Sequence, residues 1–480
     1  MSCRSRKKGC DLKKPTCTRC QRLNIACTFE DKKFVFIKQE GGSSSTSSLM
    51  SLSSSSLGKT GSALVMDEYF WTNYLPQEDP TVDGSIGGIL SAPWIPSIRQ
   101  LAERDADVKK AMQACALAGL GWMNDDRVLV IRAASFYTQA LRQTNIALQD
   151  PIAACDDRVL ACCRLLILFE MLRRISYDPL AMTPQRNQIA DWRMHVNGTC
   201  RLVQMRGRSR HLSGLGADLY DGTRMTAIIH GLTSRQPNIF TNLEWDMPRL
   251  NMRDELYSLI NPVPQLLQDF DHFQRDAAGH KDDMQYRQHI DCGNNLMRKA
   301  LMACYALEGW EIEVLMLCYE KESSTAGVES PQSGSAHGRR SLYDVCRLYG
   351  YGFFSTCTQY WAMCNIFYGS LRKFQVQLQV FMDTWTVGEA APVLPEWVSP
   401  ELPALNIAQV ACHFFAPGMG LWAAHAAVFP VSTALRYFVT TGRKDSPAFR
   451  SMVDAFAKCK TGVIMRDFLN AIGVVQEFES

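Results

Sequence analysis

Five cysteines stand close together at the beginning of this 480-residue sequence, at spacings that suit a metal site. They are Cys3, Cys10, Cys17, Cys20 and Cys27, separated in turn by six, six, two and six residues. Thiolates at such spacing bind zinc well, because a Cys-x2-Cys pair grips one side of a tetrahedron. A segment this short and charged cannot bury enough apolar surface to fold alone. We therefore expect a metal or disulfides to stabilise it.

Basic side chains are interleaved with these cysteines. Residues 1–27 contain eight Lys or Arg residues and one acidic residue, Asp11. The eight are Arg4, Arg6, Lys7, Lys8, Lys13, Lys14, Arg19 and Arg22. Such cations offset the negative charge of zinc thiolates, and on one small surface they suit a phosphate backbone. Residues 1–38 have a net charge of +8 against −5 for the remainder, so we expect any polyanion affinity at the N-terminus.

The cysteines, the basic run between Cys3 and Cys10, and Pro15 together resemble the fungal Zn2Cys6 binuclear cluster of transcription regulators. The family pattern is Cys-x2-Cys-x6-Cys-x(5–12)-Cys-x2-Cys-x(6–8)-Cys, and its six thiolates hold two zinc ions. Matched in order, the five cysteines here are the second to the sixth of the family. The resemblance implies that they are zinc ligands and that the segment binds double-stranded DNA. It also implies that Arg6 and Lys7 read a CGG triplet in the major groove.

The other basic residues take a second role in this interpretation. Around a docked helix they would contact phosphates, and they would double as a nuclear-import patch. These residues are Arg4, Lys8, Lys13, Lys14, Arg19 and Arg22. The sequence thus predicts a nuclear, zinc-dependent regulator of transcription by RNA polymerase II.

One position departs from the family pattern. The family's first cysteine would lie three residues before Cys3, upstream of Met1, and each zinc would then keep three thiolates. An open position weakens a structural zinc site. Two explanations stay open: the chain start as printed is truncated, or the cluster has lost its function. In the second case the protein is an α-helical ligand- or protein-interaction module that no longer binds DNA.

Other interpretations of the cysteines are less favoured. Cys17-Thr-Arg-Cys20 resembles a redox pair, but Lys-Lys-Pro-Thr before it supplies no strand. A secreted disulfide knot needs a signal sequence, and Met1 to Cys10 has no apolar core. The remaining thirteen cysteines are scattered singly among apolar residues and are interpreted as reduced core thiols of an intracellular protein. They are Cys115, Cys155, Cys162, Cys163, Cys200, Cys292, Cys304, Cys318, Cys346, Cys357, Cys364, Cys412 and Cys459.

The composition divides the chain into three parts. Residues 1–30 form the cluster domain, residues 31–63 an arm and a Ser-rich linker, and residues 64–480 a large helical domain. The serine-rich stretch 41–58 is typical of a flexible tether. It contains no apolar heptads for a coiled coil, since Leu49, Leu52 and Leu57 do not make a seam. Either the protein reads one half-site as a monomer, or the large domain forms a homodimer.

Helical periodicity dominates the rest of the chain, which predicts a mostly α fold with an all-α domain. The expected helices cover 66–75, 98–119, 125–148, 156–174, 192–207, 216–233, 252–272, 283–320, 341–384, 402–441 and 446–476. In 125–148 the apolar face is expected to include Val128, Ile131, Ala134, Phe136 and Leu141. The order resembles the fungal-specific transcription factor domain over about 64–250. That resemblance rests on the buried Leu165–Glu170 run and on Trp192-x-x-His195-x-x-Gly198 before Arg206-Gly207.

Catalysis and membrane insertion find little support. No compact metal set or nucleophile elbow occurs, so we expect no enzyme; Gly214-Leu-Gly216 is interpreted as a turn, and His413 and His425 as core residues. Residues 402–435 lack charges but are interrupted by proline and glycine, which favours two buried helices with a bend over a membrane span. Aromatic residues there favour core packing over an effector cavity. They are Phe414, Phe415, Met419 and Trp422.

Overall fold

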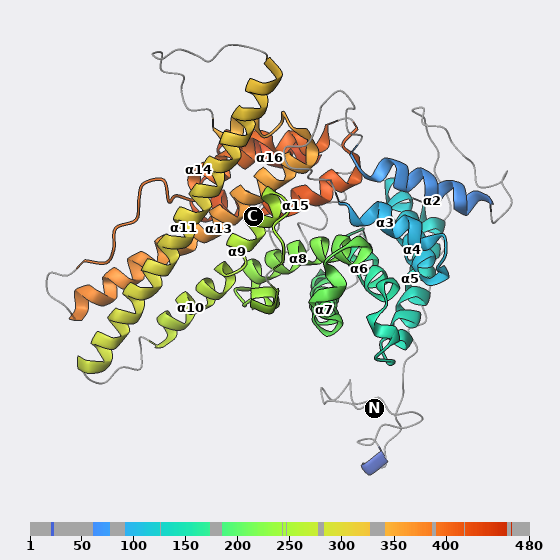
Figure 1. Cartoon of the computed structure of the whole chain (residues 1–480), viewed down its shortest axis with the longest axis horizontal. Helices are drawn as coiled ribbons and strands as arrows, with labels where there is room; N and C mark the ends of the chain where they lie inside the picture. The colour runs from blue at the N-terminus through green and yellow to red at the C-terminus, as the bar shows by residue number, and fades with distance from the viewer. Residues whose placement is uncertain are drawn as a thin grey trace. The chain divides into compact units, whose positions relative to one another are not determined.

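The structure is a computed structural model with two compact units, residues 1–56 and 57–480. The residues that it describes are 21–23, 61–76, 92–124, 126–172, 185–241, 243–245, 247–276, 283–326, 341–385, 390–416, 418–457 and 462. Throughout these ranges the regular secondary structure is helical and no strand occurs (Figure 1). The mostly α fold class is confirmed.

Seven helices make up the first half of the larger unit, among the residues described. They are α2 (Gly61–Tyr74), α3 (Trp94–Ala102), α4 (Ala106–Met123), α5 (Arg127–Ala147), α6 (Asp157–Leu172), α7 (Gln185–Arg206) and α8 (Gly214–Ser234). Helix α4 packs against α2, α3, α5 and α6, and α6 in turn packs against α7 and α8. Nearly all of α6 is buried, as its uniformly apolar sequence predicts.

Aspartate side chains cap the starts of two helices, Asp105 at α4 and Asp126 at α5. The Asp105 carboxylate accepts hydrogen bonds from the backbone N–H groups of Asp107 and Val108, both at 2.9 Å. A cap of this kind satisfies donors that have no partner inside the helix. The sequence predicted one helix over 98–119, but α3 ends at Ala102 and α4 begins at Ala106, since the capped start interrupts the run.

The buried face of α5 differs from the predicted one. Val128 and Ile131 are exposed, whereas Leu129, Ala133 and Ala140 are buried. Alanines fill the contact because α4, which contributes its own run of buried small residues, approaches closely along its length. The prediction was therefore wrong for Val128 and Ile131, whereas Phe136 and Leu141 of the predicted face are partly buried against the core.

The second half is built around two long helices. Its described helices are α9 (Met252–Ile260), α10 (Val263–Asp276), α11 (Asp283–Ala326), α12 (Leu342–Val345), α13 (Gly350–Trp385), α14 (Glu401–Val410), α15 (Gly420–Thr440) and α16 (Pro447–Ala457). Helix α13 packs against α10 and α11 and also against α14 and α15. In Figure 1, α11 and α13 run side by side.

Two predicted helices are each divided in the structure. The span 252–272 separates into α9 and α10 beside Pro262, because proline offers no backbone donor inside a helix. The span 341–384 separates into α12 and α13, and Gly350 opens α13 with a φ of +82°. A positive φ costs glycine little and other residues more.

The predicted pair of buried helices with a bend is present as α14 and α15. Gly420 begins α15 at a φ of +67°, and a Cβ at this position would lie 2.5 Å from the Tyr74 carbonyl oxygen. Only glycine fits where α2 and α15 meet so closely. Among the described residues, no helix has the length and hydropathy needed to cross a bilayer.

Candidate DNA-binding module and the polar core of the helical domain

Most of the predicted DNA-binding module lies outside the described residues. This applies to all five cluster cysteines and to seven of the eight basic residues. The seven are Arg4, Arg6, Lys7, Lys8, Lys13, Lys14 and Arg19. Arg22 is described: it lies in a helical turn at 21–23, just after Cys20, and its side chain is exposed. An exposed guanidinium beside the cluster is well suited to meet a phosphate.

The histidines of the helical domain lie apart from one another. His211 Nδ1 is 3.0 Å from the Gly216 carbonyl oxygen, and His413 Nε2 is 2.9 Å from Arg347 Nη1. His413 is partly buried and its ring lies 6.2 Å from that of the buried Phe354, so it lies at the edge of the core rather than inside it. No group of three or more metal-binding side chains occurs among the residues that the structure describes.

His425 lies deep inside the fold, as predicted. Its Nδ1 is 2.8 Å from the Tyr74 hydroxyl, which joins α15 to α2. The ring is 5% exposed, and burial lowers its pKa to about 3. His425 is therefore a neutral structural residue at physiological pH.

Buried thiols are frequent among the described cysteines, and all of these are free. Burial raises the pKa of Cys162, Cys163 and Cys200 to about 12, which keeps these thiols protonated and unreactive. Cys292 and Cys412 are exposed, so the prediction that the scattered cysteines are core thiols fails at these two positions.

An ion pair between the buried Arg206 and the half-exposed Asp157 ties α7 to α6, and the sequence did not reveal it. Arg206, with a 1% exposed side chain, donates a hydrogen bond to Asp157 in the first turn of α6. At the start of α6 the Asp157 carboxylate also complements the helix dipole. The pair makes Arg206 part of the packing between two helices, because an unpaired buried guanidinium would be costly.

A second buried arginine lies between α6, α8 and α3. The Arg164 guanidinium lies 5.1 Å from the centroid of the Trp94 ring and donates to Thr226 Oγ1 at 3.0 Å. Burial lowers its pKa to about 10. A Cβ on Gly222 would lie 2.7 Å from Arg164 Nη2, so this glycine provides the space for the guanidinium.

A third arginine connects the two halves of the larger unit. Arg224 on α8 donates to the Asp254 carbonyl at 3.0 Å and to Ser258 Oγ at 2.8 Å, both on α9. Tyr257, beneath the same guanidinium, donates to Gln359 Oε1 on α13 at 2.8 Å. These contacts hold α8, α9 and α13 together, which is a structural role.

Gly214-Leu-Gly216 forms the first turn of α8, so the helix predicted over 216–233 begins two residues earlier, inside the predicted turn. Gly214 has a φ of +61°, and a Cβ on Gly216 would lie 2.0 Å from the Arg210 carbonyl oxygen. The positive φ explains Gly214, and close approach to the preceding segment explains Gly216.

A cleft of about 270 Å³ opens between α2, the end of α4 and the start of α15. Phe414 and Phe415 line it together with Phe70, Tyr74 and Met123. Phe414 also packs against Phe354 in the core, so the predicted core packing and the cavity occur together. The other two residues of that predicted aromatic group, Met419 and Trp422, are partly buried against the core.

Comparison with known families matches both parts of the chain. Residues 1–34 match the family model of the fungal Zn(2)-Cys(6) binuclear cluster domain, and residues 85–309 match that of the fungal specific transcription factor domain. An uncharacterized protein of Emericella nidulans is 30% identical over 135 residues, 28% of this chain and 26% of that protein. The chain thus spans about a quarter of the length of this curated relative. No solved structure matches.

The chain therefore carries a zinc-cluster domain of DNA-binding type followed by a helical domain of regulatory type. Both matches agree with the resemblance to fungal Zn2Cys6 transcription factors that the cysteine spacing indicated. The helical match extends from before α3 into α11, so helices α12 to α16 lie beyond it.

Proposed function

We propose that this protein is a nuclear, sequence-specific regulator of RNA polymerase II transcription that recognises CGG-type half-sites. The observation that carries the proposal is the match of residues 1–34 to the Zn2Cys6 cluster domain, on the cysteine and basic-residue spacing of this sequence. The helical domain then acts as the regulatory part, consistent with its match to the fungal specific transcription factor domain.

Zinc supplies the structural constraint that the short N-terminal module lacks. Cys3, Cys10, Cys17, Cys20 and Cys27 would hold the metal, and their thiol donors fit a zinc site. An intact cluster holds two ions. Because so little apolar surface is available in this segment, metal binding and folding of the module are coupled.

Basic residues between Cys3 and Cys10 contact the bases. Arg6 and Lys7 reach guanine acceptors in the major groove, where O6 and N7 distinguish a G·C pair from the others. Phosphate contacts, which fix the register without reading the sequence, fall to the remaining basic residues. These are Arg4, Lys8, Lys13, Lys14, Arg19 and the exposed Arg22.

Binding of the full-length chain to labelled duplexes tests the proposal. Fluorescence anisotropy should show tighter binding to a CGG duplex than to a scrambled duplex of equal length, and a zinc chelator should remove the difference. Equal affinity for both duplexes with zinc present would contradict it. That result would favour the alternative, an α-helical interaction module whose cluster no longer binds DNA.

The salt dependence of the same binding separates phosphate contacts from base contacts. Replacing Lys33 and Lys38 by alanine should reduce the slope of log affinity against log salt by about one unit for each phosphate that is no longer neutralised. An unchanged slope would show that these two lysines do not bind phosphates.

A further inference from the structure

Helix α11 carries an apolar stripe on the face that points away from its own core. Met302, Tyr305, Gly309, Ile312, Met316 and Tyr319 follow one another at intervals of three and four residues, and we call these six the outer seam. Met302 is 73% exposed and Ile312 54%. A Cβ on Gly309 would meet no atom within 4 Å. Intervals of three and four over six positions form an a/d heptad pattern.

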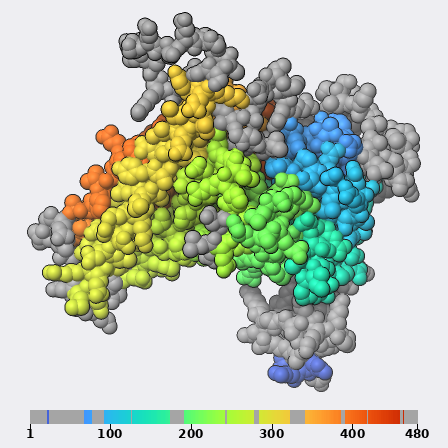
Figure 2. All heavy atoms as spheres, viewed as in Figure 1, coloured from blue at the N-terminus to red at the C-terminus, as the bar shows by residue number. Residues whose placement is uncertain are grey.

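The opposite face of α11 already supplies the core. Ala300, Cys304, Leu307, Val314 and Cys318 are buried at helical spacing. Most of the outer seam therefore lies outside this core, while α11 is long enough to present it over several turns. Figure 2 shows α11 forming the front surface of the helical unit along most of its length. Contiguous exposed apolar residues of this kind mark interaction surfaces.

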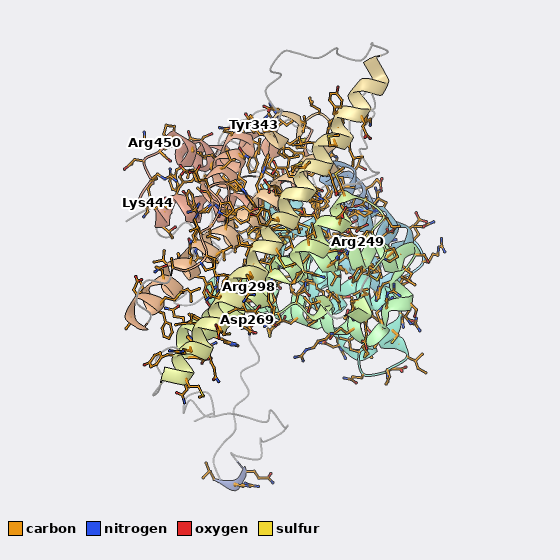
Figure 3. The ribbon with its side chains drawn as sticks, turned by 60° about the vertical axis from the view of Figure 1, so that its left-hand side comes forward. Arg249, Asp269, Arg298, Tyr343, Lys444 and Arg450 are labelled. Atoms are coloured by element: carbon orange, nitrogen blue, oxygen red, sulfur yellow. The ribbon has the colours of Figure 1, made fainter. Side chains whose placement is uncertain are left out.

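Charge along the helix is unevenly distributed beside the seam. Arg298 and Lys299 are exposed before it, and Figure 3 shows Arg298 on the outer side of α11. Glu308 and Glu313 flank its centre, and Glu320 flanks its end. At the positions that border the seam, the basic Lys299 thus precedes the acidic Glu308, Glu313 and Glu320, which distinguishes a parallel from an antiparallel partner helix.

Heptad geometry assigns the flanking pairs in each arrangement. Two parallel copies would place Glu308 of one opposite Glu313 of the other, twice by symmetry, and like charges would repel. Two antiparallel copies place Lys299 opposite Glu320 and Glu313 opposite Ala306. The apolar layers also match, since Gly309 receives Ile312 of the second copy at the centre. Only the antiparallel pair is complementary in charge.

We propose that the outer seam of α11 is a homodimer interface in which two copies of this chain pair antiparallel about a two-fold axis near Gly309 and Ile312. Tyr305 extends the surface, since its ring contacts the partly exposed Trp397 at 5.5 Å between centroids. The antiparallel arrangement gives the isologous contact of a closed dimer. The Ser-rich linker contains no coiled-coil heptads that could hold two chains together. The α11 interface would do so instead and would bring two DNA-binding modules together. It does not depend on whether those modules bind DNA.

Light scattering after size-exclusion chromatography of the full chain tests the interface without DNA. At micromolar concentration the wild type should elute at twice the chain mass of 54.0 kDa, and Ile312→Glu should elute at the mass of one chain. Val380→Glu is the matched control, because Val380 is also apolar and exposed but lies on α13. It should remain dimeric. A monomeric wild type, or a dimeric Ile312→Glu protein, would overturn the proposal.

A charge exchange tests the antiparallel register. Lys299→Glu places like charges opposite each other at two symmetric positions and should weaken dimerisation about tenfold. Adding Glu320→Lys in the same chain should restore the wild-type dissociation constant, because positions 299 and 320 then carry opposite charges again, with their signs exchanged. If the double variant is as weak as the single one, Lys299 does not face Glu320 and the register is wrong.

Discussion

The two matched regions of this protein depend on different physical means of staying folded. The N-terminal module has a net charge of +8 over residues 1–38 and concentrates five cysteines in 27 residues, so its order depends on metal. The helical domain buries a continuous apolar core and encloses its arginines in ion pairs and ring contacts. Its order depends on burial.

Because of this difference, we expect DNA binding to depend on the N-terminal module and the stability of the helical domain to depend on its buried residues. Substitutions in the module should change DNA binding without unfolding the helical domain. Substitutions at the buried arginines should do the reverse. Affinity for DNA and the free energy of unfolding should therefore respond to different substitutions.

Loss of two thiolates should abolish specific DNA binding. Cys17→Ser together with Cys20→Ser removes a Cys-x2-Cys pair, and affinity for a CGG duplex should fall to that for a scrambled duplex. Thermal unfolding of the helical domain, followed by circular dichroism, should be unchanged. Cys292→Ser, at an exposed thiol on α11, should change neither. A lower unfolding midpoint in the double variant alone would show that the two regions are not independent.

Breaking the ion pair between α6 and α7 should destabilise the helical domain. Asp157→Ala leaves the Arg206 side chain, 1% exposed, without its carboxylate; because Asp157 is itself 45% exposed and partly screened by water, the free energy of unfolding in urea should fall by about 1–2 kcal/mol. The control Asp445→Ala removes a fully exposed partner of Arg450, which lies at the periphery in Figure 3, and should cost almost nothing. Equal losses in both variants would contradict the role of Arg206. Affinity for DNA should be unchanged.

Removal of one base-reading side chain should reduce discrimination. Lys7→Ala should cost about 1–3 kcal/mol of binding free energy on a CGG duplex and much less on a scrambled duplex. Anisotropy titrations at one salt concentration measure both affinities. The same loss on both duplexes would assign Lys7 to the phosphates.

Acid should weaken the helical domain through His425. Its folded pKa of about 3 lies below the unfolded value near 6.5, so only the unfolded state takes up a proton as the pH falls through this range. This residue alone should remove about 2 kcal/mol of stability between pH 7 and pH 5. His425→Gln should show a shallower decrease in unfolding free energy over that interval. A parallel decrease in both proteins would mean that His425 is protonated when folded.

The cluster was predictable from sequence because its ligands are local. Spacing alone identified Cys3 to Cys27, and the apolar run Leu165–Glu170 identified α6. Long-range contacts were not predictable: nothing near Asp157 in the sequence indicates that Arg206 lies against it. The exposed Val128 and Ile131 show the same limit, since only the close approach of α4 selects the alanine face of α5. The outer seam was overlooked because its apolar residues resemble a core face until burial is known.

Zinc content per chain tests the central claim most directly. Elemental analysis should compare the full chain as printed, the same chain extended so that a cysteine stands three residues before Cys3, and the Cys17→Ser, Cys20→Ser variant. The account predicts two zinc ions in the extended protein, fewer in the printed one and fewest in the variant. Absence of zinc from both the extended and the printed protein would contradict the zinc-cluster assignment.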